Sequence, residues 1–131
     1  MQNTSLSPVK CVSYCEYDFS VDGGAVSAIT VECNPIPAGA IITSGVIHVK
    51  TAVTSAGSAT VAIQALSSED ILAATGKASL TLNALLDVVP VGTAATMIRA
   101  TSNITTLTFT IGTAALTAGR ICVALDYFVT A

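Results

Sequence analysis

Apolar and polar residues alternate along most of this chain with the period of two that is typical of half-buried β-strands. The alternation is clearest in residues 5–21 and 120–130. In the second of these segments the predicted inward face is apolar and comprises Ile121, Val123, Leu125, Tyr127 and Val129. Its other face carries Cys122, Ala124, Asp126 and Phe128 and is mostly apolar. That double apolar character predicts a central strand, or one that meets a neighbouring subunit.

Eight to ten short strands are expected, with turns every eight to twelve residues. The predicted strands or extended segments cover residues 5–21, 25–33, 40–53, 58–66, 77–82, 86–89, 96–100, 103–111 and 120–130. Segments 40–53 and 58–66 flank the turn Ser55-Ala56-Gly57 and are expected to form a hairpin. Gly45 lies inside the first of them, which predicts a bulge or a close backbone approach.

One helix is predicted. Ser67 and Asp70 resemble a helix start, because polar side chains at this spacing can cap free backbone N–H groups. Residues 71–74 would form one or two turns, which Gly76 would end. The sequence therefore predicts an all-β fold, a two-sheet antiparallel β-sandwich of jelly-roll type with one short helix. The length favours a single domain over residues 1–131, with residues 1–8 as a flexible lead or arm.

Composition narrows the class of protein. Charged residues make up 10% of the chain, against about 25% in a typical soluble domain, and mean hydropathy is +0.74. A membrane-spanning helix needs about 20 predominantly apolar residues, but prolines, glycines and hydroxyl side chains interrupt the uncharged runs 33–49 and 51–68. An obligate oligomer or a component of a larger shell is therefore favoured. The start of the chain predicts no signal peptide, and a net charge of −3 without a basic cluster argues against direct nucleic-acid binding.

The reactive side chains predict no catalytic, cofactor or metal site. The four cysteines (Cys11, Cys15, Cys33 and Cys122) lack paired CxxC spacing, so buried free thiols are favoured over a metal site or disulfides. His48 is the single histidine, and no nucleophile motif such as GxSxG accompanies it. Two acidic groups, at residues 16–22 and 69–70, match no calcium-loop spacing. We therefore expect a non-enzymatic protein.

Several turn and strand signatures resemble one family. These are Pro37-Ala38-Gly39-Ala40-Ile41 before a strand that ends in Lys50-Thr51-Ala52, then Asp70-Ile71-Leu72-Ala73-Ala74, and the closing stretch from Leu116 to Tyr127. Together they are similar to capsid decoration, or cement, proteins of tailed bacteriophages, and the resemblance covers about three-quarters of the chain. Gln64-Ala65-Leu66 departs from the family pattern, which has a glycine there. The segment 9–21 has no counterpart.

The resemblance implies a structural virion protein that binds the outer surface of an assembled capsid and bridges neighbouring major capsid subunits, often as a homotrimer. The protein would be made in the host cytoplasm and reside on the capsid surface, with no cofactor, membrane or nucleic-acid partner. Candidate capsid or subunit contacts are Val9, Lys10, Val12, Tyr14, Pro35, Ile36, Pro37 and Phe128. The alternative is a carbohydrate- or receptor-binding β-sandwich of a phage fibre or tail, with Tyr14 as its outward aromatic ring. A third class, a small hydrolase, would require His48 beside a serine or cysteine and an acid.

Overall fold

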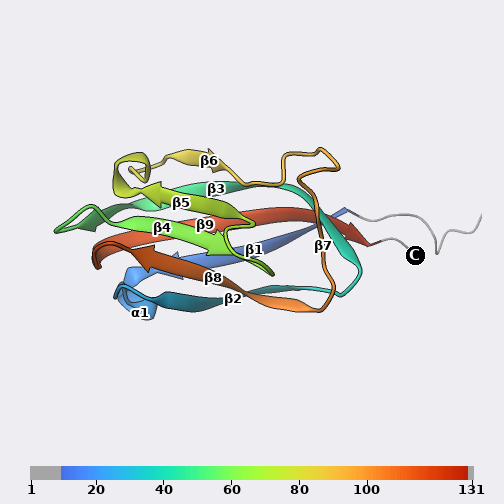
Figure 1. Cartoon of the computed structure of the whole chain (residues 1–131), viewed down its shortest axis with the longest axis horizontal. Helices are drawn as coiled ribbons and strands as arrows, with labels where there is room; N and C mark the ends of the chain where they lie inside the picture. The colour runs from blue at the N-terminus through green and yellow to red at the C-terminus, as the bar shows by residue number, and fades with distance from the viewer. Residues whose placement is uncertain (1–9, 130–131) are drawn as a thin grey trace, which may run out of the picture.

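The part of the chain that the computed structural model describes, residues 10–129, forms one continuous antiparallel sheet of nine strands, which curls so that its two halves face each other as the layers of a sandwich (Figure 1). Its elements are β1 (Lys10–Asp18), α1 (Phe19–Asp22), β2 (Ala28–Ile36), β3 (Ala40–Ser55), β4 (Thr60–Gln64), β5 (Leu72–Gly76), the 3₁₀ turn η2 (Lys77–Ser79), β6 (Leu85–Asp87), β7 (Ile98–Arg99), β8 (Ile104–Gly112) and β9 (Leu116–Val129). One half, called the first sheet from here on, contains β1, β9 and β3, with β6 and β7 both paired to β3. The other half, called the second sheet, contains β2, β8, β4 and β5. The predicted all-β antiparallel fold is confirmed.

The two sheets meet along one seam and enclose a shared core. At the seam β1 pairs with β2 through Cys15 and Cys33. Inside the sandwich the ring of Tyr17 on β1 stacks on the ring of Phe109 on β8, with centroids 5.3 Å apart. Both rings are fully buried. The contact therefore joins the inner faces of the two sheets directly.

The last strand lies at the centre of the first sheet, as its two apolar faces predicted. β9 pairs with β1 on one side and with β3 on the other. Ile121, Val123 and Leu125 have at most 1% of their surface exposed, and Tyr127 has 9%. Val129 is 39% exposed; it was predicted to face inward, but it ends the strand beyond the edge of the core.

Gly45 allows β3 to approach β9 closely. The register between these strands shifts between Ile42 and Ser44, and a Cβ at Gly45 would lie 2.5 Å from the carbonyl oxygen of Ala124. The prediction of a bulge with a close backbone approach is confirmed.

The predicted hairpin of segments 40–53 and 58–66 is wrong. β3 pairs with β9, β6 and β7, whereas β4 pairs with β5 and β8 in the other sheet. The turn after Ser55 therefore carries the chain from one sheet to the other. A glycine-containing turn between two apolar strands has the same sequence pattern in either case, because alternation reports the buried face and not the neighbour. Val61 and Ile63 do point into the core, as predicted.

The helix predicted at residues 71–74 is also wrong, because residues 72–76 form β5. The carboxylate of Asp70 accepts hydrogen bonds from the backbone N–H groups of Ala65, Leu66 and Ser67, which precede it. The bond from Ser67 N–H is the one that a capping box would make, but Asp70 also accepts from the two residues before Ser67 and closes a turn, and residues 72–76 continue as β5, paired with β4, instead of a helix. The short α-helix is α1, where Asp18 ends β1 and its side chain accepts from the N–H of Ser20.

The predicted first strand is too long at its C-terminal end. It was expected to run to Val21, but β1 ends at Asp18 and Val21 is 80% exposed. Its predicted start at residues 5–9, and the predicted arm at residues 1–8, lie outside the described residues. No helix within residues 10–129 is long and apolar enough to cross a bilayer.

Candidate interaction surface

The outer face of the first sheet carries four of the eight residues singled out as candidate contacts. Along β1 the side chains of Lys10, Val12 and Tyr14 point away from the core, because the alternate residues are the partly or fully buried ones. Val12 is 59% exposed and Tyr14 is 43% exposed. Phe128 of β9 lies directly opposite Lys10 in the register. The alternation in the sequence therefore predicted this face correctly.

Strand pairing places four side chains in one line across this face. Arg99 of β7 pairs with Ile41 of β3, Ile41 pairs with Phe128 of β9, and Phe128 pairs with Lys10 of β1. Directly opposed residues of neighbouring strands project from the same face of a sheet. We call these four residues the cationic row, since a cation stands at each end and two apolar side chains lie between.

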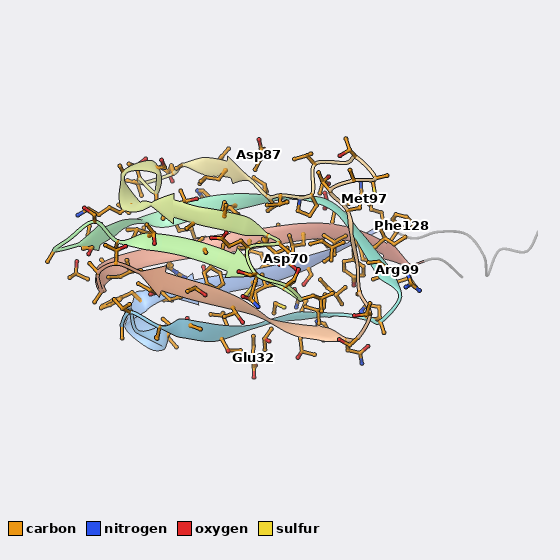
Figure 2. The ribbon with its side chains drawn as sticks, viewed as in Figure 1. Glu32, Asp70, Asp87, Met97, Arg99 and Phe128 are labelled. Atoms are coloured by element: carbon orange, nitrogen blue, oxygen red, sulfur yellow. The ribbon has the colours of Figure 1, made fainter. Side chains whose placement is uncertain are left out.

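A groove of about 530 Å³ opens beside the cationic row, lined by Lys10, Thr43, Ser44, Gly92, Met97 and Phe128. The loop between β6 and β7 forms one wall of this groove, and the N–H of Gly92 fixes it by donating to the carbonyl oxygen of Thr43 at 2.8 Å. Figure 2 shows Met97, Phe128 and Arg99 together at this end of the sandwich. The groove therefore lies where the row meets the loop.

The remaining candidate contacts divide between the surface, the core and the undescribed end of the chain. Pro35 and Pro37 are exposed. The turn that follows them lies beside β7, since the N–H of Gly39 donates to the carbonyl oxygen of Ala100 at 2.7 Å. The side chain of Ile36 is fully buried, so it belongs to the core and not to a surface. Val9 lies outside the described residues.

Arg99, Ile41 and Met97 were not recognised as part of this surface from the sequence. β7 is only two residues long, too short to show any alternation. Met97 reaches the groove through a loop that has no periodic pattern. Only the pairing of β7 with β3 brings them beside Phe128.

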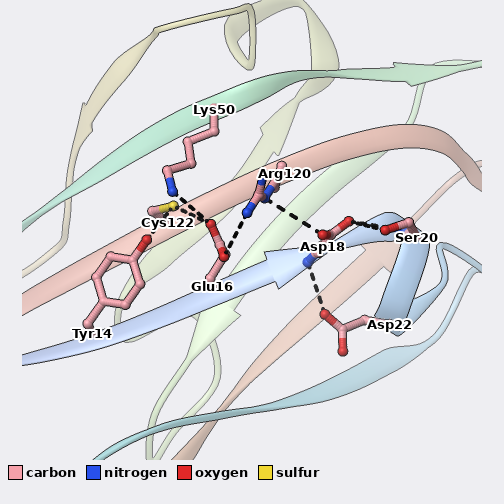
Figure 3. Close-up of polar contacts among 8 residues, drawn as sticks. All are labelled: Tyr14, Glu16, Asp18, Ser20, Asp22, Lys50, Arg120 and Cys122. Carbon is pink, nitrogen blue, oxygen red and sulfur yellow. Dashed lines mark hydrogen bonds and ion pairs between the residues drawn. The ribbon is translucent and has the colours of Figure 1, made fainter.

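A polar cluster occupies the same outer face nearer to α1 (Figure 3). Glu16 accepts from Lys50 Nζ at 3.1 Å through Oε1 and from Arg120 Nη2 at 3.3 Å through Oε2. The thiol of Cys122 also donates to Glu16 Oε1, at 3.2 Å, and itself accepts from the hydroxyl of Tyr14 at 2.9 Å. Glu16 is therefore the acceptor at the centre of the cluster.

The contacts and the burial within this cluster shift the pKa values of Glu16, Tyr14 and Cys122. The thiol of Cys122, followed by Lys50 and Arg120, lowers the pKa of Glu16 to about 2. The hydrogen bond to Cys122 raises the pKa of Tyr14, and burial raises the pKa of the Cys122 thiol. The cluster is a charge-paired surface that joins β1, β3 and β9.

His48 lies beside a cysteine, as the hydrolase hypothesis required, but the bonding does not fit a nucleophile. His48 and Cys122 are register partners, yet His48 Nε2 lies 3.4 Å from Asn83 Oδ1 and the thiol donates to Glu16. A nucleophilic cysteine needs a lowered pKa and access to substrate. Cys122 has a raised pKa and is 5% exposed.

Cys15 and Cys33 are register partners and form a thiol pair at the seam. A hydrogen bond from Cys15 lowers the pKa of Cys33 to about 7, and the same bond, together with burial, raises the pKa of Cys15. Within residues 10–129 no disulfide joins the cysteines, and no group of three or more His, Cys, Asp or Glu side chains in that range is arranged to hold a metal ion.

Solved structures with this fold come from three bacteriophage capsids. A chain of the cyanophage Pam1 capsid asymmetric unit matches with a TM-score of 0.69 at 18% identity, over 98% of this chain and 91% of that one. A chain from the acidic stable capsid of Helicobacter pylori bacteriophage KHP30 matches with a TM-score of 0.63 at 14% identity, over 95% and 94%. One from the capsid of Ralstonia phage GP4 matches with a TM-score of 0.58 at 14% identity, over 92% and 86%. No protein-family model and no curated protein matches the sequence. This chain therefore shares its fold with chains of phage capsids.

Proposed function

We propose that this protein is a structural component of a bacteriophage virion that binds the outer surface of the assembled capsid. There it bridges neighbouring major capsid subunits and stabilises the shell. The observation that carries the proposal is the full-length likeness of the fold to chains from three phage capsids. At least 86% of each matched chain is covered as well, so these chains are of about this size and contain little besides this fold.

The surface chemistry supports a role in assembly. An outer sheet face with Val12 and Tyr14 half exposed, beside an apolar-lined groove, presents apolar surface that gains free energy on leaving water. A total of 10% charged residues provides little repulsion between copies or against a shell.

Bridging gives a direct physical route to shell stability. A protein that binds only where several capsid subunits meet binds the assembled shell and not its dissociated subunits, and it therefore shifts the equilibrium towards the shell. We propose a homotrimer as the binding form, because linked copies make the second and third contacts intramolecular and strengthen a weak single contact.

Reconstitution tests the proposal. Capsids of the phage that encodes this chain, assembled without it, are mixed with purified protein, and bound protein is counted per major capsid subunit after sedimentation. We expect saturation at a fixed ratio, a trimer mass in solution, and a higher temperature of capsid disruption. A protein that stays monomeric and does not sediment with capsids contradicts the proposal.

Tyr14 keeps one alternative class open to experiment. Its half-exposed ring lies next to the polar groups of Glu16 and Lys50, and an aromatic face beside hydrogen-bonding groups is suited to stacking on a sugar ring. Binding to a glycan array that Tyr14→Ala abolishes, with no capsid binding, would assign the protein to carbohydrate recognition in place of shell stabilisation.

A further inference from the structure

We propose that the cationic row and its groove bind an extended acidic segment of the partner, in which an apolar side chain lies between two carboxylates. The inference rests on the proposed function and specifies the chemistry of the capsid segment that docks at this end of the sandwich.

Two basic residues that lack a carboxylate partner in the described range lie at the two ends of the cationic row. Among the five basic residues, Lys50 and Arg120 bond to Glu16, and Lys77 donates to the carbonyl oxygen of Ser55. Lys10 and Arg99 are the remaining two, and no carboxylate within residues 10–129 forms an ion pair with either. Both stand at the ends of the cationic row. In a chain with a net charge of −3, these two cations therefore have no carboxylate partner among residues 10–129 and suit an external carboxylate.

The apolar part of the site lies between these cations. Ile41 and Phe128 occupy the middle of the row and are half buried, and Met97 lines the groove beside them. Val12 and Val91 add exposed apolar surface nearby, at 59% and 56%. Apolar surface framed by charge is the usual composition of a specific contact, because the apolar centre supplies affinity and the charges fix orientation.

The spacing of the row defines the pattern of the partner. Lys10 and Arg99 lie three strand intervals apart, roughly 14 Å at 4.7–4.9 Å per interval. In an extended chain residues i and i+4 lie about 13 Å apart, and their side chains project from the same face. Acidic residues at positions i and i+4 with an apolar residue at i+2 therefore match Arg99, the Ile41 and Phe128 pair, and Lys10.

Asp126 restricts the position that the segment takes. It lies two residues before Phe128 on the same face of β9, where its carboxylate accepts from Ser44 Oγ at 3.1 Å. A partner carboxylate shifted towards Asp126 would meet a like charge, whereas one over Lys10 or Arg99 would not. Asp126 therefore favours the alignment in which the partner's carboxylates lie over Lys10 and Arg99.

The first test reverses the charges of the cationic row and measures binding to capsids. Binding of the wild type, Lys10→Glu, Arg99→Glu and the double variant to decoration-free capsids is measured at two salt concentrations. Each single variant is expected to weaken binding several-fold and the double variant about tenfold or more, with a smaller salt dependence. Lys77→Glu makes the same change of charge at the far end of β3 and is expected to bind within about twofold of the wild type.

The results separate this inference from the proposed function. Wild-type protein that does not bind capsids contradicts both. Wild-type binding that the double variant fully retains overturns the acidic-segment site and leaves the capsid role intact. Binding lost together with a change in the oligomer mass assigns the row to contacts between copies of this chain, and that also overturns the inference.

A capsid-independent probe provides the second test. A blocked synthetic peptide with the sequence Ser-Asp-Ser-Leu-Ser-Asp-Ser is titrated into the protein, and backbone amide shifts are followed by NMR. Concentration-dependent shifts are expected at Lys10, Met97, Arg99 and Phe128, and are expected to vanish in the double variant. A matched peptide with lysine in place of both aspartates serves as the control, and equal shifts with that peptide would overturn the inference.

Discussion

Gly45 of β3 lies so close to the backbone carbonyl oxygen of Ala124 in β9 that a Cβ atom would be 2.5 Å from it. The two longest strands of the first sheet therefore approach each other closely here, beside the bulge near Ser44. The neighbouring atom is backbone in a central strand, so it cannot move aside as a flexible side chain could.

Gly45→Ala is therefore expected to lower the free energy of unfolding by about 1–3 kcal/mol, the usual range for forcing an extra methyl group into a packed interior. Urea unfolding followed by circular dichroism measures the change. Gly76→Ala is the matched control, since a Cβ there has no atom within 4 Å, and we expect little loss or a small gain in stability. Equal losses in both variants would show that the close approach is not the cause.

Glu16 is expected to make the free energy of unfolding depend on pH. Its pKa in the folded protein is lowered to about 2 from an ordinary value of 4.5, so the folded state favours the carboxylate. This contribution is fully present above about pH 4.5 and is lost as the pH falls from there towards 2. Glu16→Gln is expected to lower stability at neutral pH and to flatten the acid limb of a plot of unfolding free energy against pH. Glu32→Gln, on the exposed face of β2, is expected to keep the wild-type limb.

The strand faces were predictable because alternation reports burial directly. Leu107 and Phe109 of β8, like Ile121 and Val123 of β9, point inward as expected, since a shift of one residue would expose every one of them. The partners of each strand could not be predicted. The turn after Ser55 looks the same whether it closes a hairpin or crosses between sheets, and only the packed core selects the crossing.

Asp70 explains why the region after it was mistaken for a helix. Its carboxylate accepts from the N–H groups of Ala65, Leu66 and Ser67 at 2.6, 2.9 and 2.9 Å, which closes the turn between β4 and β5. Ser67 and Asp70 have the same spacing in sequence whether a helix or a strand follows, and only the pairing of β5 with β4 selects the strand.

Asp70→Ala is therefore expected to lower the free energy of unfolding by about 1–3 kcal/mol, because three N–H groups lose a charged acceptor. Asp87→Ala provides the control, since Asp87 is exposed at the end of β6 and makes no side-chain hydrogen bond among the contacts of residues 10–129. Thermal unfolding of the two variants at pH 7 measures the difference. An Asp70→Ala protein as stable as Asp87→Ala would show that water replaces the lost acceptor at no cost.

The candidate interaction surface was predictable only in part. Lys10, Val12, Tyr14 and Phe128 were placed on an outward face by alternation within their own strands. Arg99 joins them through a two-residue strand paired to β3, and such a long-range pairing leaves no mark in the local sequence. The cationic row is therefore a property of the sheet register and not of any one segment.

Cys33 is expected to be the reactive thiol of the seam. The hydrogen bond from Cys15 lowers its pKa to about 7, and Cys33 is partly exposed whereas Cys15 is buried. The lowered pKa gives Cys33 a larger thiolate fraction near neutral pH than Cys15 has, so iodoacetamide should modify Cys33 before Cys15. In Cys15→Ala the pKa of Cys33 returns towards 9 and alkylation slows by roughly tenfold, whereas Cys122→Ala leaves the rate unchanged. Peptide mass spectrometry of timed samples measures both rates, and an unchanged rate in Cys15→Ala would show that the neighbouring thiol does not stabilise the thiolate.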